Sequence, residues 1–211
     1  MTDAAESDAE LLHAWREGAT EAGDALVQRH FRAVFRFFSS KVGENAEELT
    51  QRTFLACVEA KDRIESTRSF RAYLFGIARH ILLQYLAKHY GREGKIEPHE
   101  ASLHDMGMNA GPGFVTARED QRMLFTALAT LPLDLQLTLE LHYWWGMGVA
   151  QIAEITEVPD GTVKSRLFRG RTMLREAVEA MSLEPAVRAA TLEEAAQLVG
   201  KPRKTAPPID S

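Results

Sequence analysis

The segment VAQIAEITEVPDGTVKSRLFRGRTMLRE, residues 149–176, contains the side chains best suited to bind a charged polymer. It reads as a short helix, a tight turn at residues 158–161 and a longer basic helix, which is the pattern of a helix-turn-helix. At about 100° per residue, the second helix carries one apolar stripe that predicts its buried face. The stripe consists of Val163, Leu167, Gly170, Leu174 and Val178. Ile152 and Ile155 of the short helix are spaced to pack against it.

The other faces of the longer helix carry groups that suit DNA. Arginine can hold guanine through two hydrogen bonds, and lysine and hydroxyl groups near a helix start suit phosphates or bases. The candidate DNA-binding residues are Thr162, Lys164, Ser165, Arg166, Arg169 and Arg171. The alternative is a solvated surface helix, and the preceding turn and short helix favour DNA binding over it. For Trp144 and Trp145, which end the helix before, we expect packing rather than base stacking.

The net charge of −5 over 211 residues makes the distribution of charge decisive for DNA binding. Residues 67–95 hold 6 Lys and Arg against 1 Asp or Glu, and residues 159–176 hold 5 against 2. The segments that precede each of them, residues 1–66 and 119–158, are acidic. Two basic segments would attract phosphates on local faces and leave other surfaces for protein partners.

The first basic segment, SFRAYLFGIARHILLQYLAKH, predicts a helix capped by Ser69. Its expected core stripe is Leu74, Ile77, Ile81 and Tyr85. Basic and aromatic side chains around the stripe could hold single-stranded DNA by charge and stacking, although the aromatics could equally be buried. The aromatic residues considered are Tyr73, Phe75 and Tyr90, and the candidate DNA-binding residues are Arg71, Tyr73, Arg79, His80 and Gln84.

The segment AEELTQRTFLACVEA predicts a helix with one mixed polar and apolar face. Glu48, Gln51, Leu55 and Val58 share this face by their spacing. Such a face suits docking of a partner helix, and the alternative is a partly buried helix of a bundle.

We expect these segments to belong to an all-α chain, in which a flexible linker joins two small helical domains. About four helices run from Asp8 to His89, and about four more follow Glu119, with no period-2 pattern that would predict strands. The expected divisions are a domain at 1–90, a linker rich in Gly and Pro at 91–118, and a helix-turn-helix domain at 119–181. In the extension at 182–211, Thr191 and Glu194 have capping-box spacing, which predicts a short helix before a disordered tail.

Catalysis finds little support in the sequence. His99, Glu100 and His104 resemble a zinc-protease pattern, but the two histidines are five residues apart and lie in the linker. Cys57 is the single cysteine, which excludes an internal disulfide and predicts a small core residue in a reducing cytoplasm. The sequence shows no phosphate-binding glycine loop and no nucleophile elbow, so we expect no catalytic residue, cofactor or metal. We also expect no leader peptide and no membrane insertion, because the first residues are acidic and no apolar run is long enough for a membrane span.

Three segments in this order, EELTQRTF, FRAYLFGIAR and GTVKSRLFRGR, resemble the extracytoplasmic-function sigma factors of the sigma-70 family. The resemblance covers about residues 10–90 and 119–178. It implies that the first segment contacts core RNA polymerase, that the second recognises the minus 10 promoter element and that the third reads the minus 35 element. The residues implied in polymerase binding are Glu48, Gln51, Phe54 and Leu55. Core polymerase, promoter DNA and a sequestering anti-sigma factor are the partners that follow from the resemblance.

The sequence departs from the family pattern at three positions. Arg52 stands where an acidic residue is usual, His80 where an asparagine is usual and Gly170 where alanine is common. An imidazole cannot reproduce the paired donor and acceptor of an amide, which bears on minus 10 specificity. The rival hypothesis is a free-standing helix-turn-helix regulator that works without polymerase, and it explains only the second half of the chain.

Overall fold

A computed structural model describes residues 6–64, 69–91, 95–108, 119–181 and 191, without the side chains of 119–121. Within these residues the chain forms helices and no strand, which confirms the all-α prediction. None of the described helices is both long and apolar enough to cross a membrane. The short helix and tail predicted after residue 181 lie outside the described residues, apart from Thr191.

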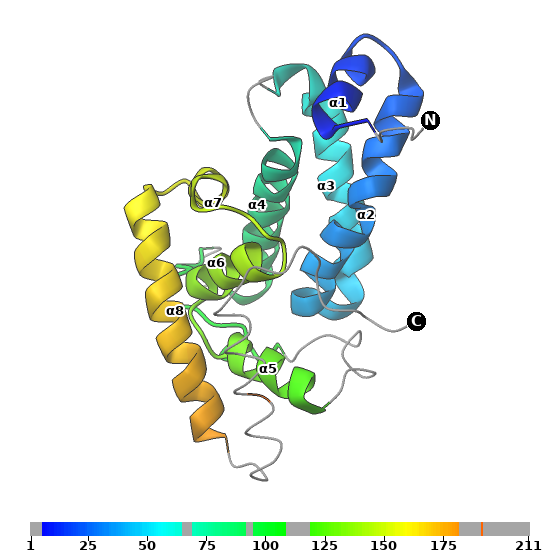
Figure 1. Cartoon of the computed structure of the whole chain (residues 1–211). Helices are drawn as coiled ribbons and strands as arrows, with labels where there is room; N and C mark the ends of the chain where they lie inside the picture. Colours follow the sequence, from blue (N-terminus) through cyan, green and yellow to red (C-terminus); the bar gives the residue numbers. More distant parts are fainter. Residues whose placement is uncertain (1–5, 65–68, 92–94, 109–118, 182–190, 192–211) are drawn as a thin grey trace.

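The first unit consists of four helices, the number that the sequence predicts. They are α1 (Asp8–Arg16), α2 (Thr20–Val42), α3 (Ala46–Ala60) and α4 (Phe70–Tyr90), with short 3-10 turns at Gly43–Asn45 and Lys61–Arg63. Figure 1 shows α2 and α3 side by side, with α4 next to them. Ser69 accepts a hydrogen bond from the backbone N–H of Ala72, so the predicted cap of α4 is confirmed.

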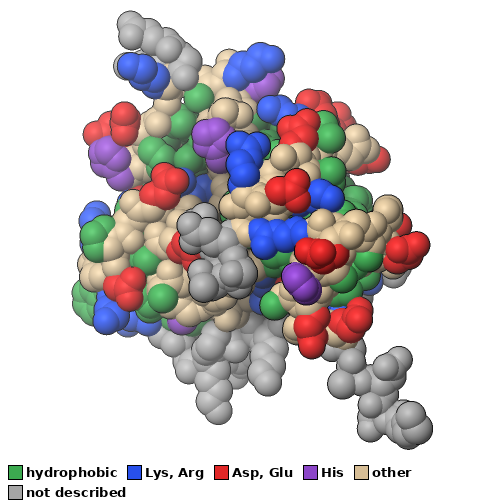
Figure 2. Space-filling view, turned by 90° about the horizontal axis from the view of Figure 1, so that it is seen from above, with side chains coloured by type: hydrophobic (Ala, Val, Ile, Leu, Met, Phe, Trp, Pro, Cys, Tyr) green, Lys and Arg blue, Asp and Glu red, His purple; other side chains and the backbone are tan. Residues whose placement is uncertain are grey.

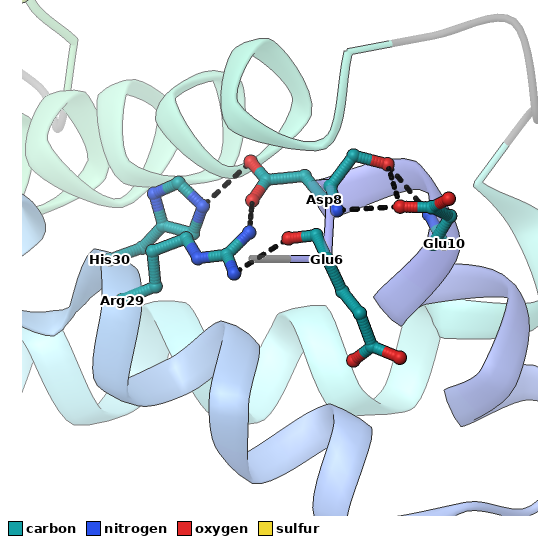
Figure 3. A network of polar contacts seen from close by, with 6 residues as sticks. Glu6, Asp8, Glu10, Arg29 and His30 are labelled. Atoms are coloured by element: carbon teal, nitrogen blue, oxygen red, sulfur yellow. Dashed lines mark hydrogen bonds and ion pairs between the residues drawn. The ribbon is translucent and has the colours of Figure 1, made fainter. Parts of the chain in front are cut away.

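A polar network joins α1 to α2 at one end of this unit (Figure 3). Asp8 in the first turn of α1 accepts from Arg29 Nη1 at 2.7 Å and lies 2.8 Å from His30 Nε2. Arg29 also donates to the carbonyl of Glu6 at 2.8 Å. Ser7 begins α1 with a capping box that Glu10 completes. The helix start is therefore fixed both within α1 and against α2.

The second unit also has four helices: α5 (Glu119–Ala129), α6 (Leu133–Tyr143), α7 (Val149–Thr156) and α8 (Asp160–Ala180). Helix α6 is the centre of this unit, since most of its side chains are buried. In Figure 1 it lies between α8 and the helices of the first unit. Apolar residues on several faces of α6 are required for a helix in this position.

Residues 95–108 pack on the second unit, although they lie in the segment for which the sequence predicts a flexible linker. Leu103 is buried. The backbone of His104 donates to Ala129 at 2.9 Å, and that of Leu133 donates to Ala101 at 2.8 Å. Several apolar side chains of the segment pack on the core and, with these backbone bonds, hold it in place. These contacts give no periodic signal in the sequence.

The two units contact each other through α4 and α7. The rings of Phe75 and Trp145 lie 5.2 Å apart between them. Both Trp144 and Trp145 are buried, which confirms packing as their role. Phe75 is fully buried as well, so it cannot stack on a DNA base in this arrangement.

The core stripe predicted for α4 is correct only in part. Leu74 and Ile81 are buried, but Ile77 and Tyr85 are half-buried. The buried set extends to a second face that includes Leu82, because α4 packs on both the first unit and α7. A helix covered on two sides has no single apolar stripe.

Candidate nucleic-acid interface

Helices α7 and α8 form the turn and the two helices that the sequence predicts. Glu157 ends α7 with φ of 58°, a left-handed conformation that reverses the chain, and Pro159 precedes α8. All five stripe residues of α8 are buried, and so are Ile152 and Ile155 of α7. The predicted apolar stripe is therefore confirmed, and it determines which side chains of α8 face outward.

Three of the six candidate residues on α8 are exposed. Lys164, Ser165 and Arg169 face solvent, and the Ser165 hydroxyl donates to the carbonyl of Thr162 at 2.8 Å. Thr162 itself is half-buried in the first turn. Lys164 and Ser165 lie near the start of α8 and Arg169 lies about one turn further along, and exposed groups of these kinds suit the edges of bases and the phosphates beside them.

The two remaining arginines of α8 bind within their own unit. Arg166 Nε lies 3.1 Å from the carboxylate of Asp134, and their side chains are 19% and 12% exposed. Arg171 donates to the hydroxyl of Tyr143 at 3.2 Å. Both arginines therefore also hold α8 against α6, and contact with DNA would require them to exchange these partners.

On α4, the candidate residues divide between solvent and the second unit. His80 and Gln84 are exposed, and Nε2 of Gln84 lies 2.9 Å from Nε2 of His80. Arg71 donates a hydrogen bond to the carbonyl of Trp145, in the second unit. Tyr73 and Arg79 are half-buried.

Arg79 lies close to charged groups of the second unit. Burial lowers the pKa of its guanidinium; the charge of Glu157 opposes that shift, and the charge of Arg166 adds to it. The arginines of the two helices that resemble DNA-binding segments therefore come near each other, one from each unit. Figure 2 shows basic and acidic side chains interspersed on the upper face of the molecule rather than gathered into one basic surface.

The candidate docking face on α3 is exposed, with one exception. Glu48, Gln51 and Leu55 face solvent, whereas Phe54 is buried and its ring lies 6.1 Å from that of Phe31. Phe31 on α2 is an exposed aromatic residue that the sequence reading did not single out. Because α2 and α3 meet only in three dimensions, no spacing along the chain links these two rings.

An open cavity of about 580 Å³ lies between α3, α4 and α7. The two units share its wall, which includes Arg52 and Leu55 from α3, His80 and Gln84 from α4, and Glu154 from α7. The exposed face of α3 is therefore continuous with the exposed part of α4.

The described residues contain no group of His, Cys, Asp and Glu that could hold a metal ion. His99 pairs with Glu97 at 3.8 Å and with Glu100 at 3.6 Å, all on the surface. Cys57 is buried, as expected of a core residue, and burial raises the pKa of its thiol to about 12. Such a thiol is protonated at neutral pH and is a poor nucleophile.

Two family models match the two units. Residues 26–92 match sigma-70 region 2, and residues 121–174 match sigma-70, region 4. The first match spans α3 and α4, and the second includes α7 and most of α8.

Relatives along most of the chain agree with these matches. An ECF RNA polymerase sigma-E factor of Haemophilus influenzae is 25% identical over 185 residues, which cover 82% of this chain and 96% of the relative. The factor of the same name from Escherichia coli is 25% identical over 181 residues, covering 82% and 95%.

Two solved structures share the fold. CnrH in complex with the cytosolic domain of CnrY has a TM-score of 0.62 at 23% identity and covers 84% of this chain and 100% of that one. The sigma factor RpoE of Bartonella quintana, in complex with the anti-sigma factor NepR, has a TM-score of 0.57 at 22% identity and covers 74% and 96%. With both regions matched in order, the chain belongs to the sigma-70 family, as a factor of the extracytoplasmic-function type.

Proposed function

We propose that this chain directs core RNA polymerase to specific promoters and supports the initiation of transcription. The observation that carries the proposal is the helix α8, whose apolar stripe is buried and whose Lys164, Ser165 and Arg169 are exposed, in one chain with a region 2 unit. A helix presented in this way can enter the major groove of DNA. The region 2 unit distinguishes the chain from a free-standing helix-turn-helix regulator.

We assign reading of the minus 35 element to α8 and recognition of the minus 10 element to α4. On α4, His80 and Gln84 are exposed and adjacent, so they are the groups that meet a base first. Arg71 and Arg79 would join them after release from the second unit. The corresponding division of the chain is 1–90 and 119–181 for the two domains, with 91–118 between them and 182–211 as an extension.

We assign polymerase docking to the outer face of α3. Glu48 and Gln51 offer hydrogen-bonding groups there, and Leu55 offers an apolar contact that is 59% exposed. Phe54 would act indirectly, since it is covered by Phe31 and supports the shape of the face. A mixed face of this kind suits a partner helix.

In this role the chain binds and positions other molecules in the cytoplasm and catalyses no reaction itself. The two solved structures with this fold hold partner proteins, the cytosolic domain of CnrY in one and the anti-sigma factor NepR in the other. By that likeness, a sequestering anti-sigma partner is expected for this chain as well.

The test is co-elution of the purified chain with bacterial core RNA polymerase, followed by run-off transcription from a genomic promoter library. We expect a stable complex and start sites that core polymerase alone does not use. Absence of a complex, with no anti-sigma factor present, would favour the free-standing regulator. In that case a dimer on two-fold related half-sites should appear instead.

A further inference from the structure

His80 and Gln84 form a hydrogen-bonded pair on the exposed side of α4. They lie four residues apart, so they are neighbours on successive turns of the helix surface. Both side chains are exposed, and the two Nε2 atoms that face each other are 2.9 Å apart. Among the described residues, no other hydrogen bond engages either side chain. The remaining polar atoms of the pair are therefore available to a ligand.

The atoms in this contact define the protonation state of the imidazole. An amide nitrogen donates hydrogen bonds and cannot accept one, so Nε2 of Gln84 donates and Nε2 of His80 accepts. The imidazole is then neutral and carries its proton on Nδ1. In this state Gln84 offers a ligand its Oε1 acceptor and its second N–H donor.

A positive charge on His80 reverses the hydrogen bond. The imidazolium has a proton on both nitrogens, so its Nε2 becomes a donor and can no longer accept from the amide. Gln84 must then turn its amide so that Oε1 accepts from His80. The terminal torsion of glutamine is broad, so an exposed side chain can make this turn. Afterwards Oε1 faces His80, and both N–H groups of the amide are available.

Ionisable groups from three helices line the open cavity beside the pair. They are Arg52 and Glu59 of α3, Tyr73 and Arg79 of α4, and Glu154 and Glu157 of α7. Lys88 lies on the next turn of α4, four residues beyond Gln84. Side chains of these types ordinarily keep one charge state between about pH 6 and pH 8, whereas histidine changes its charge in this range. A change of pH within the range therefore acts on the pair through His80.

The two states of the pair suit different bases. Adenine presents one acceptor and one donor on the edge that a glutamine amide binds, whereas guanine presents two acceptors there. The neutral pair offers an acceptor and a donor on Gln84, which matches adenine. The charged pair offers donors and a positive charge, which match guanine.

We propose that His80 and Gln84 read one base of the minus 10 element as a unit, and that the charge of His80 decides whether this unit prefers adenine or guanine. The inference rests on the proposed function, because it gives a base preference and a pH dependence to the helix to which we assign this element. It is specific to this chain, since the asparagine that is usual at the position of His80 has no charge to change.

The first measurement is made on the free full chain. Nitrogen-15 resonances of the imidazole, assigned with the help of His80→Asn, report which ring nitrogen carries the proton. At about pH 8 we expect the proton on Nδ1, and as the pH falls to about 6 we expect a growing fraction of molecules with protons on both nitrogens. A proton on Nε2 at the higher pH would overturn the pairing on which the switch depends.

The second measurement uses the chain bound to core polymerase. Promoter fragments that differ at one position of the minus 10 element compete for the holoenzyme in one reaction, so a general change of affinity with pH cancels from their ratio. At one position, we expect the ratio of bound adenine fragments to bound guanine fragments to fall about tenfold between about pH 8 and pH 6, the size expected of one bidentate contact. The other positions should keep their ratios.

Two variants separate the members of the pair. His80→Asn removes the group that changes its charge, so the ratio of adenine to guanine fragments should be the same at both pH values. Gln84→Met removes the amide that turns, so most of the pH dependence should disappear.

His89→Asn is the matched control. His89 is another exposed histidine of α4, and its Nδ1 donates to the carbonyl of Tyr85 on the same helix at 2.8 Å. This variant should keep the full change of the ratio with pH.

The outcomes distinguish the switch from the proposed function. If the complex forms but the ratio does not change with pH, or the change persists in His80→Asn, the switch is wrong and the proposed function stands. A change that persists in Gln84→Met but not in His80→Asn would mean that His80 acts alone, which would overturn the coupled pair. If the chain forms no complex with core polymerase, the proposed function fails and the inference fails with it.

Discussion

Helices α8 and α4 both carry basic residues on a segment that resembles a DNA-binding region, but they present them differently. On α8, Lys164 and Arg169 face solvent while the apolar stripe is buried in the second unit. On α4, Arg71 and Arg79 lie against the second unit, and only His80 and Gln84 are exposed among the polar candidates. The basic groups of α8 are thus exposed, whereas those of α4 are partly covered.

The difference shows that a basic pattern in the sequence does not tell whether its side chains are accessible. Accessibility depends on what packs against the helix, and here α7 packs against α4. The contrast predicts that changes in α8 act directly on DNA binding, whereas changes around α4 act partly through the contact between the units.

The largest loss of stability should come from a substitution in the buried apolar stripe of α8. Leu167 is buried in the stripe, and Leu167→Ala should lower the free energy of unfolding by about 2 to 5 kcal/mol through lost burial and a cavity. Promoter recognition should fall with it. Urea denaturation followed by circular dichroism measures the first effect, and promoter binding by the reconstituted holoenzyme measures the second.

The neighbouring residue Phe168 provides the matched control, since it is 66% exposed. Phe168→Ala should change the free energy of unfolding by no more than about 0.5 kcal/mol. Equal losses of stability from both variants would mean that α8 is not held by the stripe described above.

The next prediction compares two arginines of α8: Arg169, which is exposed, and Arg166, which pairs with Asp134. Arg169→Ala should weaken promoter binding by about 1 to 3 kcal/mol without changing stability, if it reads a base. Arg166→Ala should also lower stability by roughly 1 kcal/mol, because it leaves Asp134 without its 3.1 Å partner. Binding of holoenzyme to a promoter fragment and urea denaturation give the two quantities. Polymerase binding should be intact in both variants, and its loss would indicate misfolding.

The sequence was sufficient for the helices and for the buried face of α8. A single unit covers that face, so the 3.6-residue period predicts all five stripe residues. The caps depend on neighbouring residues only, which is why Ser69 could be recognised as the start of α4.

The contact between the units could not be predicted in the same way. The sequence leaves open whether Phe75 is exposed or buried. Lys41 of α2 and Glu140 of α6, which form a buried ion pair, are 99 residues apart. Charged residues are rarely fully buried, so nothing in the pattern around Lys41 or Glu140 indicates it. The accessibility of Arg71 depends on this contact and was unpredictable for the same reason.

Low pH should lower the free energy of unfolding of the first unit, which contains α4, by less than the substitutions in α8 do. Burial raises the pKa of Asp8, but the hydrogen bonds and charges of His30 and Arg29 outweigh it, so this pKa is lowered from 3.8. A lowered carboxylate pKa stabilises the fold above the unfolded-state value, and the stabilisation is lost as the pH falls through the folded-state value. Asp8→Asn should therefore be less stable than the parent at pH 6, and the difference should shrink as the pH falls below 3.8. Urea denaturation at several pH values measures the difference, and a constant difference would contradict it.

The smallest expected change in stability comes from replacing one glycine in α4 or one in α8 with alanine. A β-carbon at Gly76 in α4 would meet nothing within 4 Å, so Gly76→Ala should stabilise the chain by about 0.5 to 1 kcal/mol through helix propensity. At Gly170 in α8 it would lie 3.1 Å from the side chain of Leu139, and this crowding should cancel most of the same gain. Urea denaturation of both variants tests the difference. If Gly170→Ala stabilised the chain as much as Gly76→Ala, then α6 would yield to α8 more easily than the packing of Leu139 indicates. The glycine at this position would then not be needed for close approach of the two helices.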